Sequence, residues 1–520
     1  MEQKKRFFSH QFIAIALLLF GIAVRCIGIG SIPGGLNQDE AFGAYEAYSM
    51  LHYGMDSSGY AFPVYLNTWG SGMSALNSYL MIPFMALFGV HAWVIRMPQL
   101  ITSCVALYVI YRLFLRLFNE KAALIGLLYF AVCPYHIMMS RWGIDCNLAP
   151  AFLLFGFYCF VIGVEKPKYY MLSALLYGLS LYCYATIWLI VPFMILLPAL
   201  YVLYTGKLRW CRYLPLSVLI LGILALPLLL FLLVNKGYIA EIKLAFLSIP
   251  KLTVMRDSEV TFHYFTWYLR QLLTMLVRQS DGLVWNSAPV GLYYRGFLVF
   301  ALIGGIYWLK RAFTSIRKRA YDPFVLLIFP LICAVFLGCL IQVNVNKINC
   351  IHIPIVTFII TGLYVTCTFV EKYFRYAVQT LAGGLLILFI VFASWYVTDF
   401  REEIGTLWCE GLEDAVAYAD AQAALTGSDT DPAVTIYVDP SLYYPKILLY
   451  SKLPVTTYRE TVVYNNYPSI CLWIDSCGPY VFLPEAAEPG DLCIIPESEI
   501  EAYEAKGFTV TRFGHSAVVQ

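Results

Sequence analysis

Charge is scarce in this sequence. Only 13% of its 520 residues are Asp, Glu, Lys or Arg, whereas 60% are hydrophobic. Apolar runs of about 20 residues recur along the chain, and such runs are long enough to cross a bilayer. This balance excludes a chain that is soluble as a whole and predicts a multi-span membrane protein. The net charge of +2 points to no particular partner, and we expect no nucleic acid.

Several nucleotide and metal motifs are also missing. There is no GxxxxGK[ST] loop and no GxGxxG fingerprint, which argues against a nucleotide-driven machine. The fifteen cysteines form no CxxC pair or Cys/His cluster that would suggest zinc, and most lie inside apolar runs. Asp429-Thr-Asp431 matches the D-x-D pattern of nucleotide-sugar enzymes, but Pro432 follows it, so we interpret it as a turn.

The N-terminal stretch Met1–His10 carries Lys4, Lys5 and Arg6, and an apolar run follows to about Gly30. No A-x-A-like cleavage site is present, so we expect a retained first span with a cytoplasmic N-terminus. Ten further spans are predicted at about 97–117, 121–139, 148–164, 170–186, 188–205, 212–234, 291–309, 322–342, 349–369 and 376–397.

The segment 73–90 is apolar but contains Asn77 and Pro83. If it is not a span, the loops rich in Lys and Arg, such as 310–319, all fall on the cytoplasmic side, as the positive-inside rule requires. We therefore expect eleven spans and a second helix at 73–90 that lies on the surface or re-enters the membrane. Gly34–Arg96 then forms one long extracytoplasmic loop.

This loop contains the most chemically informative stretch, GGLNQDEAFGAYEAYSM at 34–50. Asn37 and Glu40 have the spacing of a capping box, which predicts a helix start with Asp39 in its first turn. Ala41, Tyr45 and Tyr48 then fall on one face, as in an amphipathic helix on the membrane surface. The two acids are candidate catalytic groups; alternatively, they only favour the helix N-terminus.

The same topology gathers other charged groups on the extracytoplasmic side. Asp145 follows the third span, and Arg96, Arg141 and Lys347 lie in external loops or at span ends. A carboxylate there can act as a general base or hold a divalent cation, and cationic groups suit a phosphate. Alternatively, the acid is a solvated loop residue and the cations contact lipid headgroups.

Four further residues are candidate substrate contacts: Tyr45, His263, Trp285 and Asn286. His263 lies in the amphipathic run FHYFTWYLRQLL and is alternatively a surface or packing residue. Trp285 is alternatively an interfacial anchor. Arg25, inside the first span near its outer end, is interpreted as a snorkelling residue.

After Val397 the sequence becomes more acidic and its pattern alternates. Helices are predicted near 405–425, 441–452 and 497–505, and strands near 433–439, 479–484, 491–495 and 508–512. We expect two domains: a membrane-embedded domain at 1–397 and a small extracytoplasmic α/β domain at 398–520. Cys471 and Cys477 either pair in an oxidising compartment or remain free.

Three stretches carry a family likeness: LNQDEAFGAYEAYSMLHYG, YLMIPFMALFGVHAWVIRMPQLI and PYHIMMSRWGIDCNLAPAF. They resemble the polyprenyl-phosphate-sugar-dependent glycosyltransferases of the GT-C superfamily, in particular the protein O-mannosyltransferase-like and lipid A aminoarabinose transferase branches. The likeness is good over about residues 1–205, weaker to 397, and absent from the C-terminal domain.

The resemblance implies an α-helical, multi-pass fold and inverting sugar transfer on the outer or lumenal face of a membrane, which we expect to be the cell membrane. It implies that Asp39 acts at the catalytic centre, that Glu40 is its acidic neighbour, and that Asp145 is a second essential acid. Arg96 and Arg141, with Lys347, are assigned to the donor phosphate. The aminoarabinose branch carries an acidic-basic-proline motif where this chain has WGSGMSALNSY. This departure argues against a metal site built on that acid, and against aminoarabinose and lipid A as substrates.

The sequence therefore predicts an integral membrane glycosyltransferase that uses a polyprenyl-phosphate sugar and an extracytoplasmic acceptor, which is a protein, a surface polymer or a lipid. For the cofactor the sequence leaves two alternatives, a divalent metal ion or none. The alternative from another class is a transporter or flippase, which is disfavoured because the spans are nearly free of Asp and Glu and no repeat is visible. A scaffold that presents the C-terminal domain is a third alternative.

Overall fold

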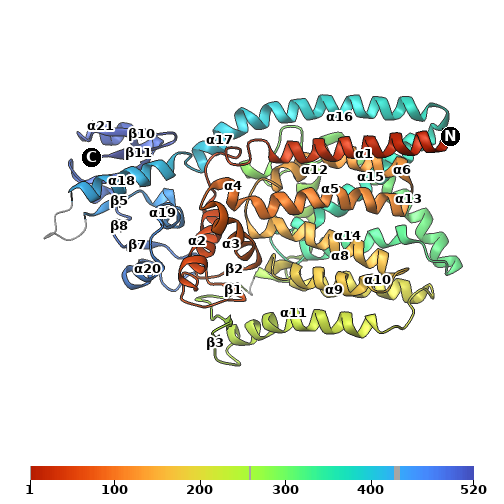
Figure 1. Cartoon of the computed structure of the whole chain (residues 1–520), viewed down its shortest axis with the longest axis horizontal. Coiled ribbons are helices and arrows are strands. Elements are labelled where there is room, and N and C mark those ends of the chain that lie inside the picture. The colour runs from red at the N-terminus through yellow and green to blue at the C-terminus, as the bar shows by residue number, and fades with distance from the viewer. Residues whose placement is uncertain (1, 257–258, 427–433) are drawn as a thin grey trace.

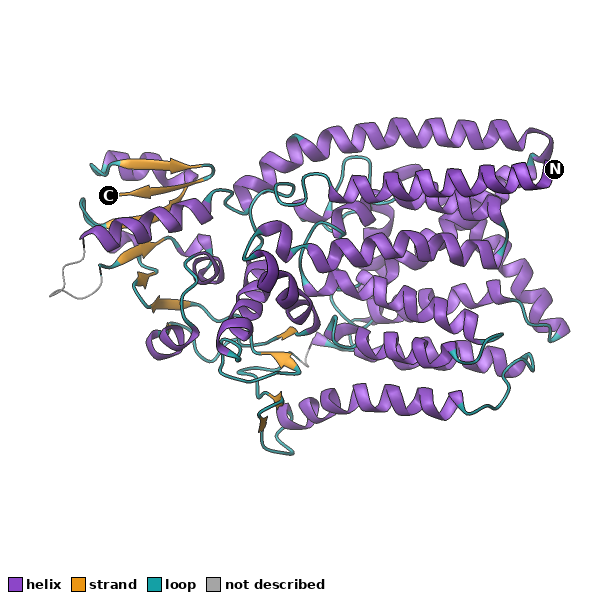
Figure 2. Cartoon of the chain, in the orientation of Figure 1, coloured by secondary structure: helices purple, strands orange, loops and turns teal. Residues whose placement is uncertain are grey.

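Two structural parts follow the change of composition at Val397. The computed structural model describes residues 2–256, 259–426 and 434–520, so Asp429 and Asp431 of the D-x-D match lie outside the described residues. A bundle of long helices forms one part, and a small α/β domain extends from one end of it (Figure 1; Figure 2). We call this end the domain end of the bundle; the N-terminus lies at the opposite end.

Each predicted span overlaps a helix of the bundle, although the bounds differ most at α13, which lies at 298–318 where 291–309 was predicted. These helices are α1 (Glu2–Cys26), α5 (Met97–Leu117), α6 (Glu120–Val132) with α7 (Pro134–Met139), α8 (Ala149–Gly163), α9 (Tyr169–Ser180), α10 (Val191–Tyr204), α11 (Tyr213–Asn235), α13 (Leu298–Lys318), α14 (Ile328–Gly338), α15 (His352–Phe369) and α16 (Phe374–Val397). Among the described residues, seven helical segments are long and apolar enough to cross a membrane. The chain is thus a multi-pass membrane protein, and the count of eleven spans stays a prediction.

The middle of the bundle is tightly packed around α15. A Cβ atom on Gly362 would lie 1.9 Å from the carbonyl oxygen of Phe300 on α13, so only glycine allows this approach of the two helices. Large apolar side chains such as Leu219, Leu302 and Ile387 point outward instead and are more than half exposed. Such an outer surface suits lipid rather than water.

Between the bundle and the C-terminal domain lie α2 (Gln38–Tyr53), β1 (Tyr65–Leu66), β2 (Met73–Ser74), α3 (Leu76–Phe88) and α4 (Ala92–Ile95). The predicted capping box is confirmed: the Asn37 side chain accepts a hydrogen bond from the backbone N–H of Asp39, and the Asn37 N–H donates to Glu40. The expected helix within 73–90 is the 13-residue α3, which is shorter than a span.

A second connecting segment joins α11 to α13 at the same end. It contains a short hairpin, β3 (Ile242–Leu244) with β4 (Leu247–Ile249), and the helix α12 (Phe265–Arg278). The 3-10 turn η4 (Val284–Asn286) then leads to α13.

The C-terminal domain is built on a seven-stranded mixed sheet with the order β10-β11-β9-β5-β8-β7-β6. The strands are β5 (Ile436–Val438), β6 (Val463–Tyr464), β7 (Ile474–Cys477), β8 (Tyr480–Val481), β9 (Leu492–Pro496), β10 (Val510–Phe513) and β11 (Ser516–Val519), and the helices are α17 (Asp399–Leu407), α18 (Leu412–Thr426), α19 (Tyr444–Tyr450), α20 (Val455–Thr461) and α21 (Ile500–Ala505). The α/β pattern predicted from the sequence is confirmed, although α17, α20, β6, β7 and β11 were not predicted. The thiols of Cys471 and Cys477 are free.

The C-terminal domain covers α2. The ring of Phe42 packs edge-on against Tyr444, with centroids 5.7 Å apart, and the hydroxyl of Tyr45 donates to the carbonyl oxygen of Leu453 at 2.8 Å. One hydrophobic core contains residues from both segments. Nine residues of α2 are therefore buried, whereas the sequence pattern suggested one apolar face and one exposed face.

Candidate active site

The Asp39 carboxylate lies in the first turn of α2 and is partly exposed. Its Oδ1 accepts a 2.8 Å hydrogen bond from the indole N–H of Trp69, and its Oδ2 accepts none from the described residues. Burial raises the pKa of Asp39, while the Trp69 hydrogen bond and the positive charge of Arg256 oppose the rise. A carboxylate held at one oxygen and open at the other can accept a proton from a substrate.

Asp145 lies near Asp39, and the charges of the two groups interact. It opens the 3-10 turn η1 (Asp145–Leu148) just before α8. Its Oδ2 accepts from the backbone N–H of Ser74 at 3.1 Å, and its Oδ1 accepts from the N–H of Cys146 at 2.7 Å. The structure therefore brings together the two acids that are more than 100 residues apart in the sequence.

Glu40 is fully buried, unlike Asp39, and forms an ion pair with the fully buried Arg96. The Nε of Arg96 lies 2.9 Å from Oε1 of Glu40, and the same oxygen accepts from the N–H of Gly143 at 2.8 Å. The remaining donors of Arg96 bind the carbonyl oxygens of Ile29, Pro33 and Gly35. This pair thus ties the start of the first loop to α5 and to the 141–145 turn.

Arg141 and Arg25 also bind protein acceptors. Arg141 is 2% exposed and donates to the carbonyl oxygens of Val24, Arg25 and Ile32. The interpretation of Arg25 as a snorkelling residue is wrong: its side chain is fully buried and donates to the carbonyl oxygens of Gly21, Phe130 and Ala131. Carbonyl groups at the C-terminal end of α6 lack helix partners, which explains why a buried guanidinium is stable there.

A second charged group surrounds Lys347. Its Nζ lies 3.0 Å from Oε2 of Glu259. Arg256, which acts on Asp39, is 3.9 Å from Oε1 of the same glutamate and also donates to the carbonyl oxygen of Ile470 in the C-terminal domain. Lys347, Glu259 and Arg256 therefore form a chain of charges beside Asp39.

The four candidate substrate contacts lie in different surroundings. Asn286 is buried, and its side-chain amide donates to Asp281 and to the side-chain oxygen of Asn346. The amide of Asn346 in turn approaches the sulfur of Cys146. Trp285, next to Asn286 in the sequence, is partly exposed. Tyr45 is fully buried beneath the C-terminal domain. The ring of His263 is exposed and packs against Tyr264.

Three residues at the site were not predicted from the sequence: Trp69, Ser74 and Arg256. Trp69 and Ser74 belong to the WGSGMSALNSY segment, where the aminoarabinose branch carries an acid and a base. Here the segment contacts the two acids through an indole and a backbone N–H instead. The one signal for Trp69 was its isolated position between two turn-forming stretches, which does not identify a partner.

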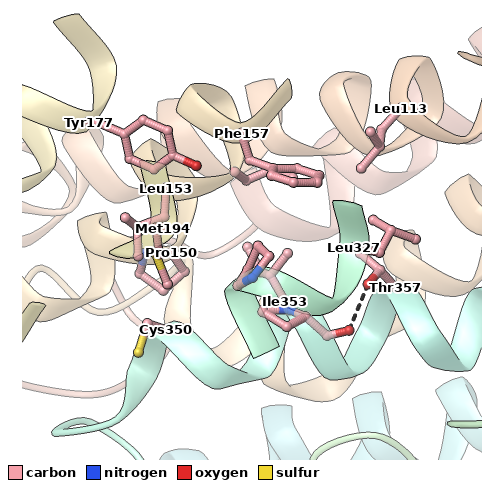
Figure 3. Close-up of a pocket in the computed structure, with 13 residues that line it drawn as sticks. Leu113, Pro150, Leu153, Phe157, Tyr177, Met194, Leu327, Cys350, Ile353 and Thr357 are labelled. Carbon is pink, nitrogen blue, oxygen red and sulfur yellow. Dashed lines mark hydrogen bonds between the residues drawn. The ribbon is translucent and has the colours of Figure 1, made fainter. Parts of the chain in front are cut away.

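An apolar pocket lies among the helices of the bundle, and its empty volume of about 430 Å³ includes space open to solvent. Figure 3 shows Pro150, Leu153 and Phe157 of α8 on one side and Cys350, Ile353 and Thr357 on the other. The other lining residues are Leu113, Leu154, Tyr177, Met194, Leu327, Pro330 and Pro354. Pro150 and Cys350 are close in sequence to Asp145 and Lys347, so one end of the pocket approaches the charged site.

The donor set for a metal ion is small. Nowhere in residues 2–256, 259–426 and 434–520 do three His, Cys, Asp or Glu side chains converge. Asp39 and Asp145 offer two carboxylates, and both oxygens of Asp145 already accept backbone hydrogen bonds. The described residues therefore do not form a complete metal site.

Comparisons with known proteins address the fold. The family model of dolichyl-phosphate-mannose-protein mannosyltransferase matches residues 74–234. ArnT from Cupriavidus metallidurans, solved bound to undecaprenyl phosphate, is 12% identical; the alignment covers 99% of this chain and 98% of ArnT, with a TM-score of 0.55. The chain has the GT-C fold.

Two further comparisons agree with this GT-C assignment. The apo form of the same ArnT gives 12% identity, a TM-score of 0.55, and coverage of 100% of this chain and 98% of that one. The apo oligosaccharyltransferase from Archaeoglobus fulgidus gives 13% identity and a TM-score of 0.51, covering 85% of this chain and 64% of its own. No curated protein matches the sequence. The resemblance noted in the sequence is thus confirmed for the GT-C fold.

Proposed function

We propose that this chain is an inverting glycosyltransferase that transfers a sugar from a polyprenyl phosphate to an acceptor on the extracytoplasmic side of a membrane. The observation that carries the proposal is the Asp39 carboxylate, which is held by Trp69 at one oxygen and open at the other, beside Asp145. The binding of undecaprenyl phosphate by the structurally similar ArnT supports the donor class.

Asp39 acts as the general base in this proposal. It removes a proton from the acceptor hydroxyl as the oxygen forms a bond to the anomeric carbon of the sugar. The bond between that carbon and the phosphate oxygen breaks, and its electrons remain on the polyprenyl phosphate. Because burial raises the pKa of Asp39, the group is a stronger base than an exposed aspartate.

The donor spans the pocket and the charged site. Its polyprenyl chain occupies the apolar pocket between α8 and α15 (Figure 3), and its phosphate lies beside Lys347 and Arg256. Both cations are paired with Glu259, so the phosphate competes with this carboxylate for them. A phosphate monoester leaves readily, so cations that stabilise its charge suffice and no acid is required.

Asp145 has an electrostatic role in the proposal. Its negative charge favours the positive charge that develops at the anomeric carbon, as carboxylates do in other glycosyl transfers. We assign a positioning role to Glu40, Arg96 and Arg141. Their polar atoms form hydrogen bonds with other protein groups at the start of the first loop and so hold this loop in place. Tyr45 and His263 have no part in the proposed site.

We assign acceptor selection to the C-terminal domain. Tyr443 is close enough to Asp39 for their charges to interact, and its ring packs against Trp473 with centroids 5.5 Å apart. Both aromatic side chains are partly exposed. They provide a surface beside the proposed base on which an acceptor can rest.

A donor assay tests the proposed function. Purified protein in detergent is mixed with radiolabelled polyprenyl-phosphate sugars and a set of acceptors, and release of free polyprenyl phosphate is followed for wild type and Asp145→Asn. Sugar transfer by the wild type and a large loss in the variant are expected. Vesicle-reconstituted protein that moves a lipid-linked sugar across the membrane without transferring it would contradict the proposal and support a flippase.

A further inference from the structure

A second polar groove lies outside the proposed active site, beside α12. Its empty volume, which is open to solvent, is about 1050 Å³. The groove is lined by one side of α12, by the turn that follows it and by one residue of the 342–348 loop: Trp267, Arg270, Gln271, Thr274, Met275, Arg278, Ser280, Asp281, Gly282 and Val343. The proposed transfer reaction does not use it.

Helix α12 has three kinds of surface around its axis. Leu272 and Met275 are buried, and Leu272 packs against Gly338 at the end of α14. Phe265, Leu273 and Val277 form an exposed apolar flank beside them. The remaining side carries Arg270, Gln271, Thr274 and Arg278, which line the groove together with Trp267 and the edge of Met275. An exposed apolar flank next to a cationic side is the pattern of helices that lie in the interface of a membrane.

The position of α12 fits this interface. The preceding segment packs Phe262 against Phe336, two residues before the end of α14, and the N–H of Thr261 donates to the carbonyl oxygen of Leu340. Phe262 is itself 68% exposed. Because α14 ends at the domain end of the bundle, α12 lies at the depth where an apolar span meets the aqueous phase.

Arg270 and Arg278 give the groove its charge. They are two helical turns apart on the groove side, both are exposed, and neither makes a hydrogen bond or ion pair to a described residue. The one carboxylate in the lining, Asp281, accepts from Leu283, Asn286 and Val345. This carboxylate is therefore satisfied by its own loops, and the groove retains two cations without a partner among the described residues.

We propose that this groove binds the phosphate headgroup of an anionic phospholipid of the surrounding membrane leaflet. The two guanidinium groups bind the phosphate, since their planar donors match its oxygens. The apolar flank of α12 lies against the acyl chains of the same leaflet. Binding of a soluble anion would not explain why this flank is exposed. A lipid is the ligand that fits both features of α12, the positive charge on one face and the exposed apolar side chains on the adjoining face.

The bound lipid would also steady the proposed active site. Asp281 in the groove wall binds Asn286, Asn286 binds Asn346, and the amide of Asn346 lies 3.9 Å from the sulfur of Cys146, next to Asp145. An anionic lipid thus holds the segment between α11 and α13 on the bundle. The binding claim itself does not depend on the proposed transfer reaction.

Lipid binding to the full chain tests this inference directly. The protein is reconstituted in nanodiscs of phosphatidylcholine that contain a small fraction of fluorescent phosphatidylglycerol, and enrichment of the anionic lipid around the protein is measured. We expect the double variant Arg270→Gln/Arg278→Gln to lose about 30-fold in preference for phosphatidylglycerol, since each arginine near the surface contributes to anionic lipid binding. Lys506→Gln/Arg512→Gln, which removes two exposed cations from the C-terminal domain, is the matched control and keeps the preference.

Three results would overturn the assignment. An unchanged preference in the Arg270/Arg278 variant would place the anionic lipid elsewhere. Displacement of phosphatidylglycerol by millimolar inorganic phosphate would assign the groove to a soluble anion. Displacement by an equimolar amount of polyprenyl phosphate would assign it to the carrier lipid. Circular dichroism of the double variant controls for folding, because both arginines are exposed and their loss should not disturb the fold.

Discussion

The indole N–H of Trp69 donates a 2.8 Å hydrogen bond to Oδ1 of Asp39. Trp69 also packs edge-on against Phe42 and Tyr444, so its orientation is fixed by α2 on one side and by the C-terminal domain on the other. The proposed base is therefore positioned by a side chain whose own place depends on both parts of the molecule.

Substitution of Trp69 by Phe should separate orientation from packing, because it keeps an aromatic ring and removes the hydrogen-bond donor. We expect kcat to fall about 10- to 100-fold. The lost hydrogen bond had lowered the pKa of Asp39, so this pKa rises further and the acidic limb of the pH profile moves to higher pH. Measurement of kcat against pH tests this prediction. An acidic limb that does not shift would show that Trp69 contributes packing but does not affect the pKa of Asp39.

The pair of Glu40 and Arg96 should determine stability. Both groups are fully buried, so Glu40→Gln leaves an uncompensated guanidinium and should lower the free energy of unfolding by about 3–5 kcal/mol. The pair of the partly buried Arg116 and the exposed Glu165 is the control, and Glu165→Gln should cost about 0–1 kcal/mol. The unfolding midpoints of the two variants are compared in detergent. Equal midpoints would contradict the stabilising role of the buried pair.

Asp56 and Glu46 make stability depend on pH. Burial raises the pKa of each, and the charge of Asp56 raises that of Glu46 further. A raised pKa means that the folded state holds protons more tightly, so this stabilisation is full below the ordinary carboxyl pKa and is lost as the pH rises through the raised values.

Asp56→Asn should therefore stabilise the protein at pH 8, by roughly 1–3 kcal/mol. The substitution removes the charge without losing a hydrogen bond, because Oδ1 keeps its two backbone donors and the replaced Oδ2 has no partner among the described residues. Unfolding midpoints between pH 5 and pH 8 measure the effect, with the exposed Asp475→Asn as control. A variant less stable than wild type at pH 8 would contradict this account.

Trp473→Ala tests the acceptor surface. Loss of the ring that packs against Tyr443 should raise the KM for the acceptor about tenfold and leave the KM for the donor unchanged. The exposed Trp210, on the loop between α10 and α11, gives a matched control in Trp210→Ala. A change in the KM for the donor alone would contradict this role and indicate that Trp473 contacts the donor instead.

The sequence predicted those features that depend on local pattern. The capping box of Asn37 and Glu40 was found because its two members are three residues apart. The helices of the bundle followed from apolar runs, and the α/β pattern after Val397 followed from alternation. In each case the responsible physical interaction lies within a few residues.

Interactions between distant segments could not be predicted in this way. Arg25 was expected to reach the membrane surface, but the carbonyl groups of Phe130 and Ala131 bind it in the core. The burial of Tyr45 depends on Leu453, and the position of Asp39 depends on Trp69. A single sequence contains the donors and acceptors of these contacts but not the packing that brings them together.

The central claim is that Asp39 is the base of a glycosyl transfer, and the turnover of Asp39→Asn tests it most directly. The variant, shown to insert and fold, is compared with wild type and with the exposed control Asp399→Asn, using a donor and acceptor that the wild type accepts. We predict a fall in kcat of about 10²- to 10⁴-fold for Asp39→Asn with donor binding retained, and no change for the control. Full transfer activity in Asp39→Asn would contradict the proposed mechanism.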